Sequence, residues 1–488
     1  MYDYGAILAF QARRVERAYP TQITDRSHPA HGAFLSETSG AHPNADHGAN
    51  ASLLASACFV LMADGSRLEG DAELFHRVQW SVAFQRRWQR PTGLIDLLSM
   101  NWESPPDTGF AVQLLAPAVD LARRLASQGN SQAQTIADSL GAFVRTAAAG
   151  MIDRGFHTPN HRWVVCSALA QAMTLFPEVE AGAYVERILT ETVDINEDGE
   201  YTERSTGVYN AVCNRSLRFM ADHLGRPDLL DPVRRNLDMM SHLFHEDGTI
   251  DTSFSNRQDR GQRIVPVAIA ESFFDMGQRD GNGGWARIAD DLVAAGEDAE
   301  HSPWLLQPFL AHPEYRRERL DRKLRPDHFA RHYPASGLWR VRRGPLSATS
   351  ATGSRTAFAV RYGEVNLRSV KFSGSYLRSA NFAADSMAAI AGGVRLEREG
   401  KAHPLPGYEL PLGRPLPVGT VHAARSSRER WTLPAIDLRL EIREVASGFD
   451  LRYVTGGGLD RIPSRSSAPS PDRESGRRRT RSSRRMTA

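Results

Sequence analysis

Ionisable side chains gather just before the apolar segment 164–176. His157, Asn160 and His161 precede this segment, and Pro159 marks the start of a helix. An amide can donate hydrogen bonds to a carboxylate, and an imidazole exchanges a proton near neutral pH. These side chains line a cleft if several helices present their N-terminal ends to one face of the molecule. In the structural alternative, Asn160 caps the helix and His161 packs beside it.

A second polar segment, residues 197–210, opens with an Asp-Gly turn. Four ionisable or aromatic side chains follow the turn: Tyr201, Glu203, Arg204 and Tyr209. A tyrosine whose pKa is lowered by a nearby cation such as Arg204 can take a proton from a substrate and return it. In the structural alternative, Glu203 and Arg204 form a surface ion pair and Tyr209 belongs to the core.

A third segment, residues 247–263, repeats the order of a helix, an Asp-Gly turn and a polar loop. Its candidate side chains are Arg257, Gln258 and Asp259. The planar guanidinium of arginine suits a carboxylate because it donates two parallel hydrogen bonds. A solvated loop is the alternative interpretation.

Two earlier segments are also polar. In segment 97–110 we expect Asn101, Trp102, Asp107 and Thr108 to line a sugar cleft, where Trp102 offers a flat face to a pyranose ring. In segment 42–50 the polar residues are His42, Asn44, Asp46 and His47. Their spacing is not diagnostic of a metal site, so we predict no metal ligands and no cofactor.

Helices must carry these loops. Apolar residues recur at helical spacing in segments 51–62, 110–126, 131–152, 164–176, 182–195, 205–225, 229–244 and 264–277. Gly-, Asp-, Asn- and Pro-rich joints separate them, which indicates helical hairpins. A closed α/α toroid fits this order, and an open solenoid fits nearly as well.

The pattern changes after Pro334. Apolar and polar residues alternate in segments 336–344, 355–363, 366–378, 392–399, 436–445 and 449–457. They predict an antiparallel β-sandwich, with segment 321–334 as the linker before it. We therefore expect an α+β chain with an α/α toroid at residues 1–330 and a β domain at residues 331–458.

Composition excludes several classes of protein. No run of eighteen apolar residues exists, so we expect no transmembrane helix and no membrane partner. Segment 1–20 lacks the features of a signal peptide, which predicts a cytoplasmic protein. Cys58, Cys166 and Cys213 lie in apolar helical segments without a CxxC pair, which predicts buried free thiols.

The C-terminal tail 459–488 carries nine arginines and three acids, a net charge of +6, and subtracting this from the total of +3 leaves −3 for the body. A mildly acidic body gives no reason to expect a nucleic-acid partner. The tail has no apolar periodicity, so we predict disorder. Because it starts abruptly after a strand, we expect a frameshift or a damaged gene end, with strands of the β domain missing. An arginine-rich arm for nucleic acid is the functional alternative.

The chain resembles heparinase II/III-like and alginate-lyase enzymes in two groups of residues: Asn160–His161, and Tyr201, Glu203, Arg204 and Tyr209. The resemblance implies an incomplete α/α toroid followed by a β-sandwich. It also implies cleavage of a uronic-acid-containing polysaccharide or oligosaccharide by β-elimination. The order of domains agrees over most of the chain, while the motifs are confined to about fifty residues.

The resemblance also assigns roles. Asn160 would bind the substrate carboxylate, His161 would be a base or a hydrogen-bond partner, and Tyr209 would be the catalytic acid and base, with Tyr201 as second choice. Seven side chains would bind the acidic glycan: Tyr201, Glu203, Arg204, Arg257, Gln258, Trp102 and Asn101. These families usually add a histidine from the β domain, and no Gly-His-rich segment follows residue 335. The chain therefore departs from the full mechanism of these families.

Two other functions stay open. A glycoside hydrolase needs two carboxylates that flank the bond, and this chain has acids enough in Glu203, Asp198, Asp251, Asp259 and Asp107. An inactive glycan-binding relative is favoured by the missing histidine and the unusual C-terminus. A lyase is the function that we predict.

Overall fold

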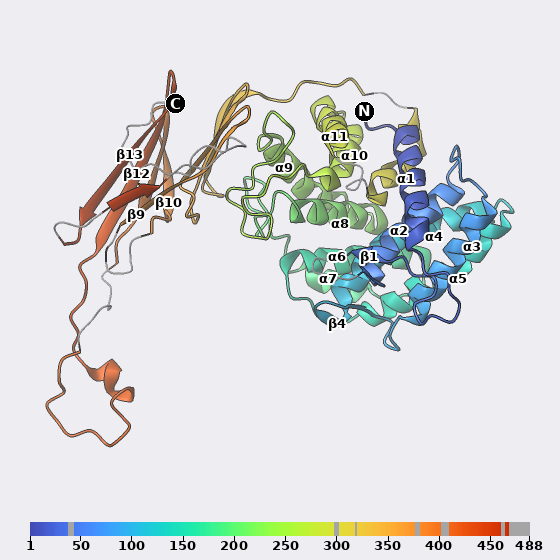
Figure 1. The fold of residues 1–488 in the computed structure, drawn as a ribbon, viewed down its shortest axis with the longest axis horizontal. Helices are drawn as coiled ribbons and strands as arrows, with labels where there is room; N and C mark the ends of the chain where they lie inside the picture. Colours follow the sequence, from blue (N-terminus) through green and yellow to red (C-terminus); the bar gives the residue numbers. More distant parts are fainter. Residues whose placement is uncertain are drawn as a thin grey trace. The chain divides into compact units, whose positions relative to one another are not determined.

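The computed structural model describes residues 1–37, 43–296, 302–317, 320–374, 376, 381–401, 409–459 and 464–467. The chain divides into two compact units, Met1–Pro326 and Asp327–Ala488. The first unit is helical and the second consists of antiparallel strands (Figure 1). The predicted α+β class is therefore confirmed.

In the described part of the first unit, twelve α-helices follow one another. They are α1 (Tyr4–Ala18), α2 (His47–Met62), α3 (Ala72–Arg87), α4 (Pro105–Ala126), α5 (Ser131–Met151), α6 (Pro159–Leu175), α7 (Gly182–Leu189), α8 (Tyr209–Leu224), α9 (Leu230–Ser241), α10 (Ala270–Asp280), α11 (Gly283–Ala295) and α12 (Gln307–Ala311). Several start at an Asp, Asn or Ser side chain that accepts a hydrogen bond from the first turn, as Asp46 does for α2 and Ser104 for α4.

Helices α2, α4, α6 and α8 form an inner row, because each packs against the next although another helix intervenes in the sequence. In α6, ten consecutive residues from Trp163 to Ala172 are buried, which is typical of a helix surrounded by others. The intervening helices α3, α5, α7 and α9 complete the hairpins. This arrangement is that of an α/α toroid.

A buried hydrogen-bonded group joins three inner helices at the same level. Gln113 Nε2 donates to Ser167 Oγ and, at 2.9 Å, to Ser216 Oγ. Each of the three residues stands seven or eight positions after the first residue of its helix, α4, α6 or α8. Near the C-terminal ends, Arg123 of α4 donates to the carbonyl of Leu175, the last residue of α6, and His223 Nδ1 of α8 lies 3.0 Å from Thr174 Oγ1 of α6. Contacts at both levels show that the three helices run parallel, with their N-terminal ends at the same end of the unit.

The helical unit also differs from the prediction. The segment 97–110 is not a plain loop, because β3 (Ile95–Leu97) and β4 (Asn101–Ser104) pair as an antiparallel hairpin that leads into α4. Helices α1, α3, α11 and α12 lie outside the predicted helical segments. The three cysteines are buried and free, as predicted.

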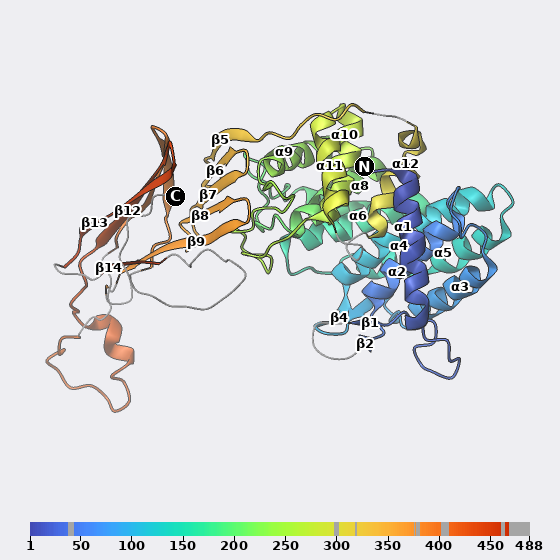
Figure 2. The same cartoon turned by 45° about the horizontal axis from the view of Figure 1, so that its top comes forward.

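Two sheets build the second unit. The six-stranded sheet has the order β14-β9-β8-β7-β6-β5, and Figure 2 shows β5 to β9 side by side. Its strands are β5 (His328–Tyr333), β6 (Leu338–Arg343), β7 (Leu346–Ala351), β8 (Phe358–Tyr362), β9 (Val365–Gly374) and β14 (Ser464–Ser467). The four-stranded sheet has the order β10-β11-β12-β13, with β10 (Ser386–Ile390), β11 (Gly393–Arg398), β12 (Ile436–Val445) and β13 (Gly448–Gly457).

The two sheets share one hydrophobic core, so the predicted β-sandwich is confirmed. Val341 and Phe358 of the larger sheet belong to the same buried cluster as Leu396 and Leu440 of the smaller one. Along β12, buried residues alternate with residues that are exposed or partly exposed, as expected of a strand with one face on a core.

Two predictions about the second unit were wrong. The segment 321–334 is not only a linker, because residues 328–333 form the edge strand β5. The tail is not unstructured from residue 459, because Ser464–Ser467 pair with β9 as strand β14. Residues 468–488 lie outside the described residues.

Candidate functional site

Glu203 and Asn160 join two of the predicted segments. Asn160 Nδ2 donates to Glu203 Oε2 at 2.5 Å and to Thr158 Oγ1 at 3.2 Å. Asn160 is the second residue of α6, where backbone N–H groups have no partner within the helix and favour negative charge. The end of α6 therefore holds the carboxylate of Glu203.

Arg257 and Gln258 bring the third segment to the same place. Arg257 Nη1 lies 3.8 Å from Glu203 Oε1, and the guanidinium carbon lies 4.9 Å from the centre of the Tyr209 ring. Gln258 Nε2 donates to the Tyr209 hydroxyl at 2.7 Å. A continuous chain of contacts thus runs from Asn160 through Glu203 and Arg257 to Tyr209.

His161 sits between aromatic neighbours at the start of α6. Its ring makes edge contacts with His157, at 4.7 Å between centroids, and with Phe110 of α4, at 6.2 Å. Burial lowers the pKa of His161 to about 4, and the positive charges of His157 and Arg257 act in the same direction. The imidazole is therefore neutral near pH 7.

Two other groups have shifted pKa values. Burial raises the pKa of the Glu203 carboxyl, and this effect is opposed by the hydrogen bond from Asn160 and the charge of Arg257. The pKa of Arg257 is also raised, chiefly by its interaction with the Tyr209 side chain and also by the charge of Glu203. Buried, mutually stabilised charges of this kind are common in functional sites and also occur in structural networks.

Four buried polar atoms of this cluster have no hydrogen-bond partner: Asn160 Oδ1, His161 Nδ1, Glu203 Oε1 and Arg257 Nε. Buried polar groups are normally hydrogen-bonded, so several such atoms in one cluster need an explanation. The cluster also has partly exposed side chains, since Arg257 is 33% exposed and Tyr209 is half-buried, and for both reasons we take it as the candidate site.

The structure changes the expected role of Asn160. Its side chain is 0% exposed, and its amide hydrogens are directed to Glu203 and Thr158. It is therefore not placed to donate to a substrate carboxylate, as the resemblance implied. In this structure it orients Glu203.

The expected roles of Tyr201 and Arg204 also need correction. Tyr201 is 1% exposed, and its hydroxyl donates to Asn214 Oδ1 at 2.8 Å, so this tyrosine belongs to the core. Arg204 has a positive φ of 47°, and its side chain pairs with Glu200 and lies over the ring of Phe254. The cation that contacts Tyr209 is Arg257.

The β3–β4 hairpin carries Asn101 and Trp102. Trp102 is 72% exposed, while Asn101 is partly buried and pairs with Leu97 in the hairpin. No contact in the described residues joins either side chain to Tyr209 or Arg257. Phe110, which contacts His161, is an apolar residue within segment 97–110, and nothing in the sequence distinguished it as part of the site.

Three other carboxylates considered for hydrolysis are engaged in local hydrogen bonds. Asp107 is hydrogen-bonded to Ser104 in the first turn of α4, and Asp251 accepts from the backbone N–H of Ser253. Asp259 is buried and accepts two hydrogen bonds from within the loops. Within the described residues, no group of three or more His, Cys, Asp or Glu side chains could hold a metal ion, and His42 is not among those residues.

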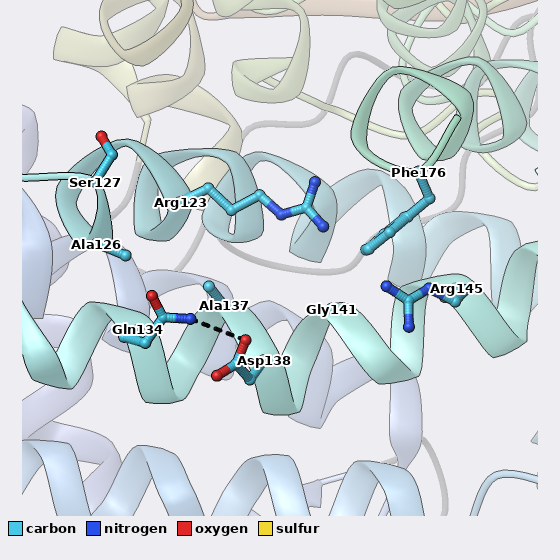
Figure 3. A pocket seen from close by; sticks show the side chains of 9 residues that line it. All are labelled: Arg123, Ala126, Ser127, Gln134, Ala137, Asp138, Gly141, Arg145 and Phe176. Carbon is cyan, nitrogen blue, oxygen red and sulfur yellow. Dashed lines mark hydrogen bonds between the residues drawn. The ribbon is translucent and has the colours of Figure 1, made fainter. Parts of the chain in front are cut away.

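A hollow of about 500 Å³ lies near the C-terminal ends of α4 and α6, away from the candidate site at their N-terminal ends (Figure 3). The C-terminal turn of α4, the middle of α5 and Phe176 line it. Arg123 and Arg145 lie over the Phe176 ring at 4.4 and 4.6 Å, and Arg123 donates to the carbonyl of Leu175 at the end of α6. These contacts have a structural role, so we do not place the site there.

Neither a protein-family model nor a curated protein matches this sequence. Among solved structures, xanthan lyase from Paenibacillus is similar with a TM-score of 0.52 and 10% identity, over 95% of this chain and 46% of that one. Chondroitin AC lyase from Streptomyces coelicolor A3, in complex with chondroitin sulphate, is similar with a TM-score of 0.50 and 13% identity, over 96% of this chain and 78% of that one. Heparinase III aligns over 96% of this chain and 85% of its own, with 11% identity and a TM-score of 0.49.

At such low identity, these likenesses show the fold alone. The chain has a fold like that of polysaccharide lyases, and it spans about half the length of the xanthan lyase that it matches. None of the helices in the described part of the chain is both long and apolar enough to cross a bilayer.

Proposed function

We propose that this chain is a lyase that cleaves a uronic-acid-containing glycan by β-elimination. The proposal depends on one observation: the Tyr209 hydroxyl accepts a hydrogen bond from Gln258, and the guanidinium of Arg257 lies over the same ring. A phenol, an amide and a guanidinium from two distant segments thus meet at the N-terminal end of α8. These are the groups that elimination next to a carboxylate requires.

In the proposed reaction, Tyr209 takes the proton from C5 of the uronate. The electron pair of the C5–H bond forms the C4–C5 double bond, and the bond between C4 and the glycosidic oxygen breaks. The departing oxygen keeps the electron pair of the broken C4–O bond and receives a proton from Tyr209. One group serves as base and then as acid, so protons and electrons balance.

Arg257 is the proposed ligand of the substrate carboxylate. Negative charge develops on this carboxylate as the C5 proton leaves, and a donor fixed at that position lowers the barrier by roughly 3 kcal/mol. The planar guanidinium can donate two parallel hydrogen bonds, and the side chain is partly exposed. Glu203 holds Arg257 from the other side, and Asn160 holds Glu203.

His161 is the proposed partner of a sugar hydroxyl. Because its pKa is about 4, it is neutral at pH 7, and a neutral imidazole can accept or donate a hydrogen bond according to its tautomer. Arg204 and Tyr201 have no direct contact with substrate in this proposal. Trp102 and Asn101 contribute a further sugar contact from the β3–β4 hairpin.

The likeness to xanthan lyase and chondroitin AC lyase supports an acidic glycan as the partner. The helical unit, Met1–Pro326, would carry the reaction.

A glycoside hydrolase is the second candidate, because burial raises the pKa of Glu203 as expected of a general acid. Hydrolysis also needs a second carboxylate near the bond. The charge of the Asp194 carboxylate also acts on Glu203, but Asp194 is hydrogen-bonded to Trp163 Nε1 and paired with Arg162. The groups that contact Glu203 are the amide of Asn160 and the guanidinium of Arg257. We therefore prefer elimination.

A screen of uronate-containing glycans for products that absorb in the ultraviolet tests the proposal. Elimination leaves a double bond conjugated with the carboxylate, and hydrolysis does not. The expected result is absorbance that grows with the wild-type chain and not with Tyr209→Phe. Neutral glycans serve as the control. Binding of uronates without any turnover would instead support an inactive glycan-binding protein.

A further inference from the structure

We propose that Asp259 is a positioning residue that locks the loop 251–262 onto the loop 203–209. Through this lock, Arg257 and Gln258 are held against Tyr209. The inference rests on the proposed function of that site, and it assigns a role to a buried carboxylate that the reaction itself does not use.

Asp259 is the one acid among the three candidate residues of segment 247–263, and its side chain is 1% exposed. Its Oδ2 accepts the backbone N–H of Gly207 at 2.9 Å, and its Oδ1 lies 2.5 Å from the hydroxyl of Ser255, which donates to it. One carboxylate thus bonds to both loops, and a buried carboxylate needs such partners.

Gly207 permits this close approach. A Cβ at position 207 would lie 3.1 Å from Asp259 Oδ2 and 2.9 Å from the Cδ1 atom of Ile264. A larger residue would push the two loops apart at this point. The sequence therefore places a glycine where the carboxylate crosses between the loops.

Further hydrogen bonds to backbone atoms join the same two loops. The carbonyl of Arg204 accepts the backbone N–H of Asn256 at 3.0 Å and lies 2.7 Å from the hydroxyl of Ser255. Thr206 Oγ1 donates to the carbonyl of Asp251 at 2.7 Å. The uncommon positive φ of Arg204 directs its carbonyl to loop 251–262, and such a conformation persists where the surroundings hold it.

The contacts of the candidate site join the same two loops. Gln258 precedes Asp259, and Tyr209 stands two residues after Gly207. The bond from Gln258 to Tyr209 and the bond from Gly207 to Asp259 are therefore neighbouring connections between the two loops. A misplacement of roughly 1 Å at such a site can lower the rate about 100-fold.

Asp259→Ala removes the lock, while Asp259→Asn can keep it. The asparagine oxygen can accept from Gly207, and its amide can donate to the Ser255 oxygen, whose hydroxyl hydrogen can then turn to the Arg204 carbonyl 2.7 Å away. On a uronate substrate we expect kcat to fall about 10- to 100-fold in Asp259→Ala and to stay within about threefold of wild type in Asp259→Asn. Leu237→Ala, in the buried face of α9, is the control for general destabilisation and should keep kcat.

Hydrogen–deuterium exchange supplies a readout that does not need activity. Peptides covering residues 203–209 and 251–262 should exchange faster in Asp259→Ala than in wild type, Asp259→Asn or Leu237→Ala. If Asp259→Ala does not fold, Gly207→Ala should give the same local effect with the carboxylate retained. If the chain cleaves no uronate at all, the exchange result still decides whether the lock exists.

Two outcomes would overturn the inference. One is unchanged exchange in both loops of Asp259→Ala. The other is a loss of kcat in Asp259→Asn as large as that in Asp259→Ala while exchange stays normal, because the charge of the carboxylate would then matter and its position would not.

Discussion

Gln258 Nε2 donates a 2.7 Å hydrogen bond to the hydroxyl of Tyr209, although 49 positions separate the two residues in the sequence. The neighbouring Arg257 lies over the ring of the same tyrosine. These two contacts distinguish Tyr209 from Tyr201, the other tyrosine of its segment. The second contact places the positive charge of Arg257 beside the phenol.

Replacing Tyr209 by Phe should abolish turnover and preserve glycan binding. The ring and its contact with Arg257 remain, but the group that carries the proton is lost. General acid–base groups contribute about 100- to 10,000-fold in rate, so kcat should fall by at least about 100-fold. Steady-state kinetics and calorimetric binding to a uronate oligosaccharide measure the two effects.

Tyr201→Phe is the matched control, because it removes the other phenol of the same segment. Asn214 then loses a buried partner, and unfolding should become easier by about 1–3 kcal/mol. The rate constant of the folded protein should not change. Equal losses of kcat in the two variants would argue against a special role for Tyr209.

Arg257→Lys should raise KM for uronate substrates about tenfold or more. Lysine keeps the charge but cannot donate two parallel hydrogen bonds to one carboxylate, and hydrogen bonds to charged groups contribute about 1.5–3 kcal/mol. Arg263→Lys is the control, since Arg263 lies in the same segment, is exposed and pairs with Asp247. A KM that rises equally in both variants would contradict the assignment of the carboxylate to Arg257.

His161 should make the folded protein less stable as the pH falls. Its pKa is lowered from 6.5 to about 4 on folding, so the unfolded chain takes up a proton first. The full stability is present above about pH 6.5, and about 3 kcal/mol is lost between pH 6.5 and 4, since one pKa unit corresponds to about 1.4 kcal/mol. Urea unfolding of wild type and His161→Gln at several pH values measures this difference.

His157→Gln tests the cause of that shift. Burial of His161 should remain, while one nearby positive charge disappears, so the pKa of His161 should rise part of the way towards its ordinary value. Titration by NMR reports it directly. A His161 pKa near 6.5 in the wild-type protein would show that the imidazole is not buried as described.

Gln113→Ala tests the register of the inner helices. The change leaves the hydroxyls of Ser167 and Ser216 without their shared donor in the core, and it removes one methylene and a carboxamide from the α4 side chain. We expect a loss of about 2–4 kcal/mol in the free energy of unfolding. A loss below about 0.5 kcal/mol would contradict the buried bridge between α4, α6 and α8.

Periodicity predicted the long helices because their apolar faces are regular. Segment 131–152 agrees closely with α5, which spans Ser131–Met151. Helix α3 was missed because charged and polar residues interrupt its apolar pattern. Strand β5 was missed because an edge strand, half exposed and rich in His and Arg, carries little alternation.

The candidate site could be predicted only in part. The three polar segments were evident, and the structure brings side chains from all three together. Which tyrosine is buried depends on the backbone: Tyr201 turns into the core before the left-handed Arg204, and Tyr209 follows at the start of α8. Residue types did not reveal that Arg257, and not Arg204, would lie over Tyr209.

Proton NMR of the reaction products tests the central claim most directly. The account predicts a vinyl proton at C4 of the new non-reducing end when the wild-type chain acts on a uronate-containing oligosaccharide, and no such signal with Tyr209→Phe. Cleavage that leaves a saturated non-reducing end, with a new hydroxyl at C4, would contradict elimination and show that this site hydrolyses its substrate.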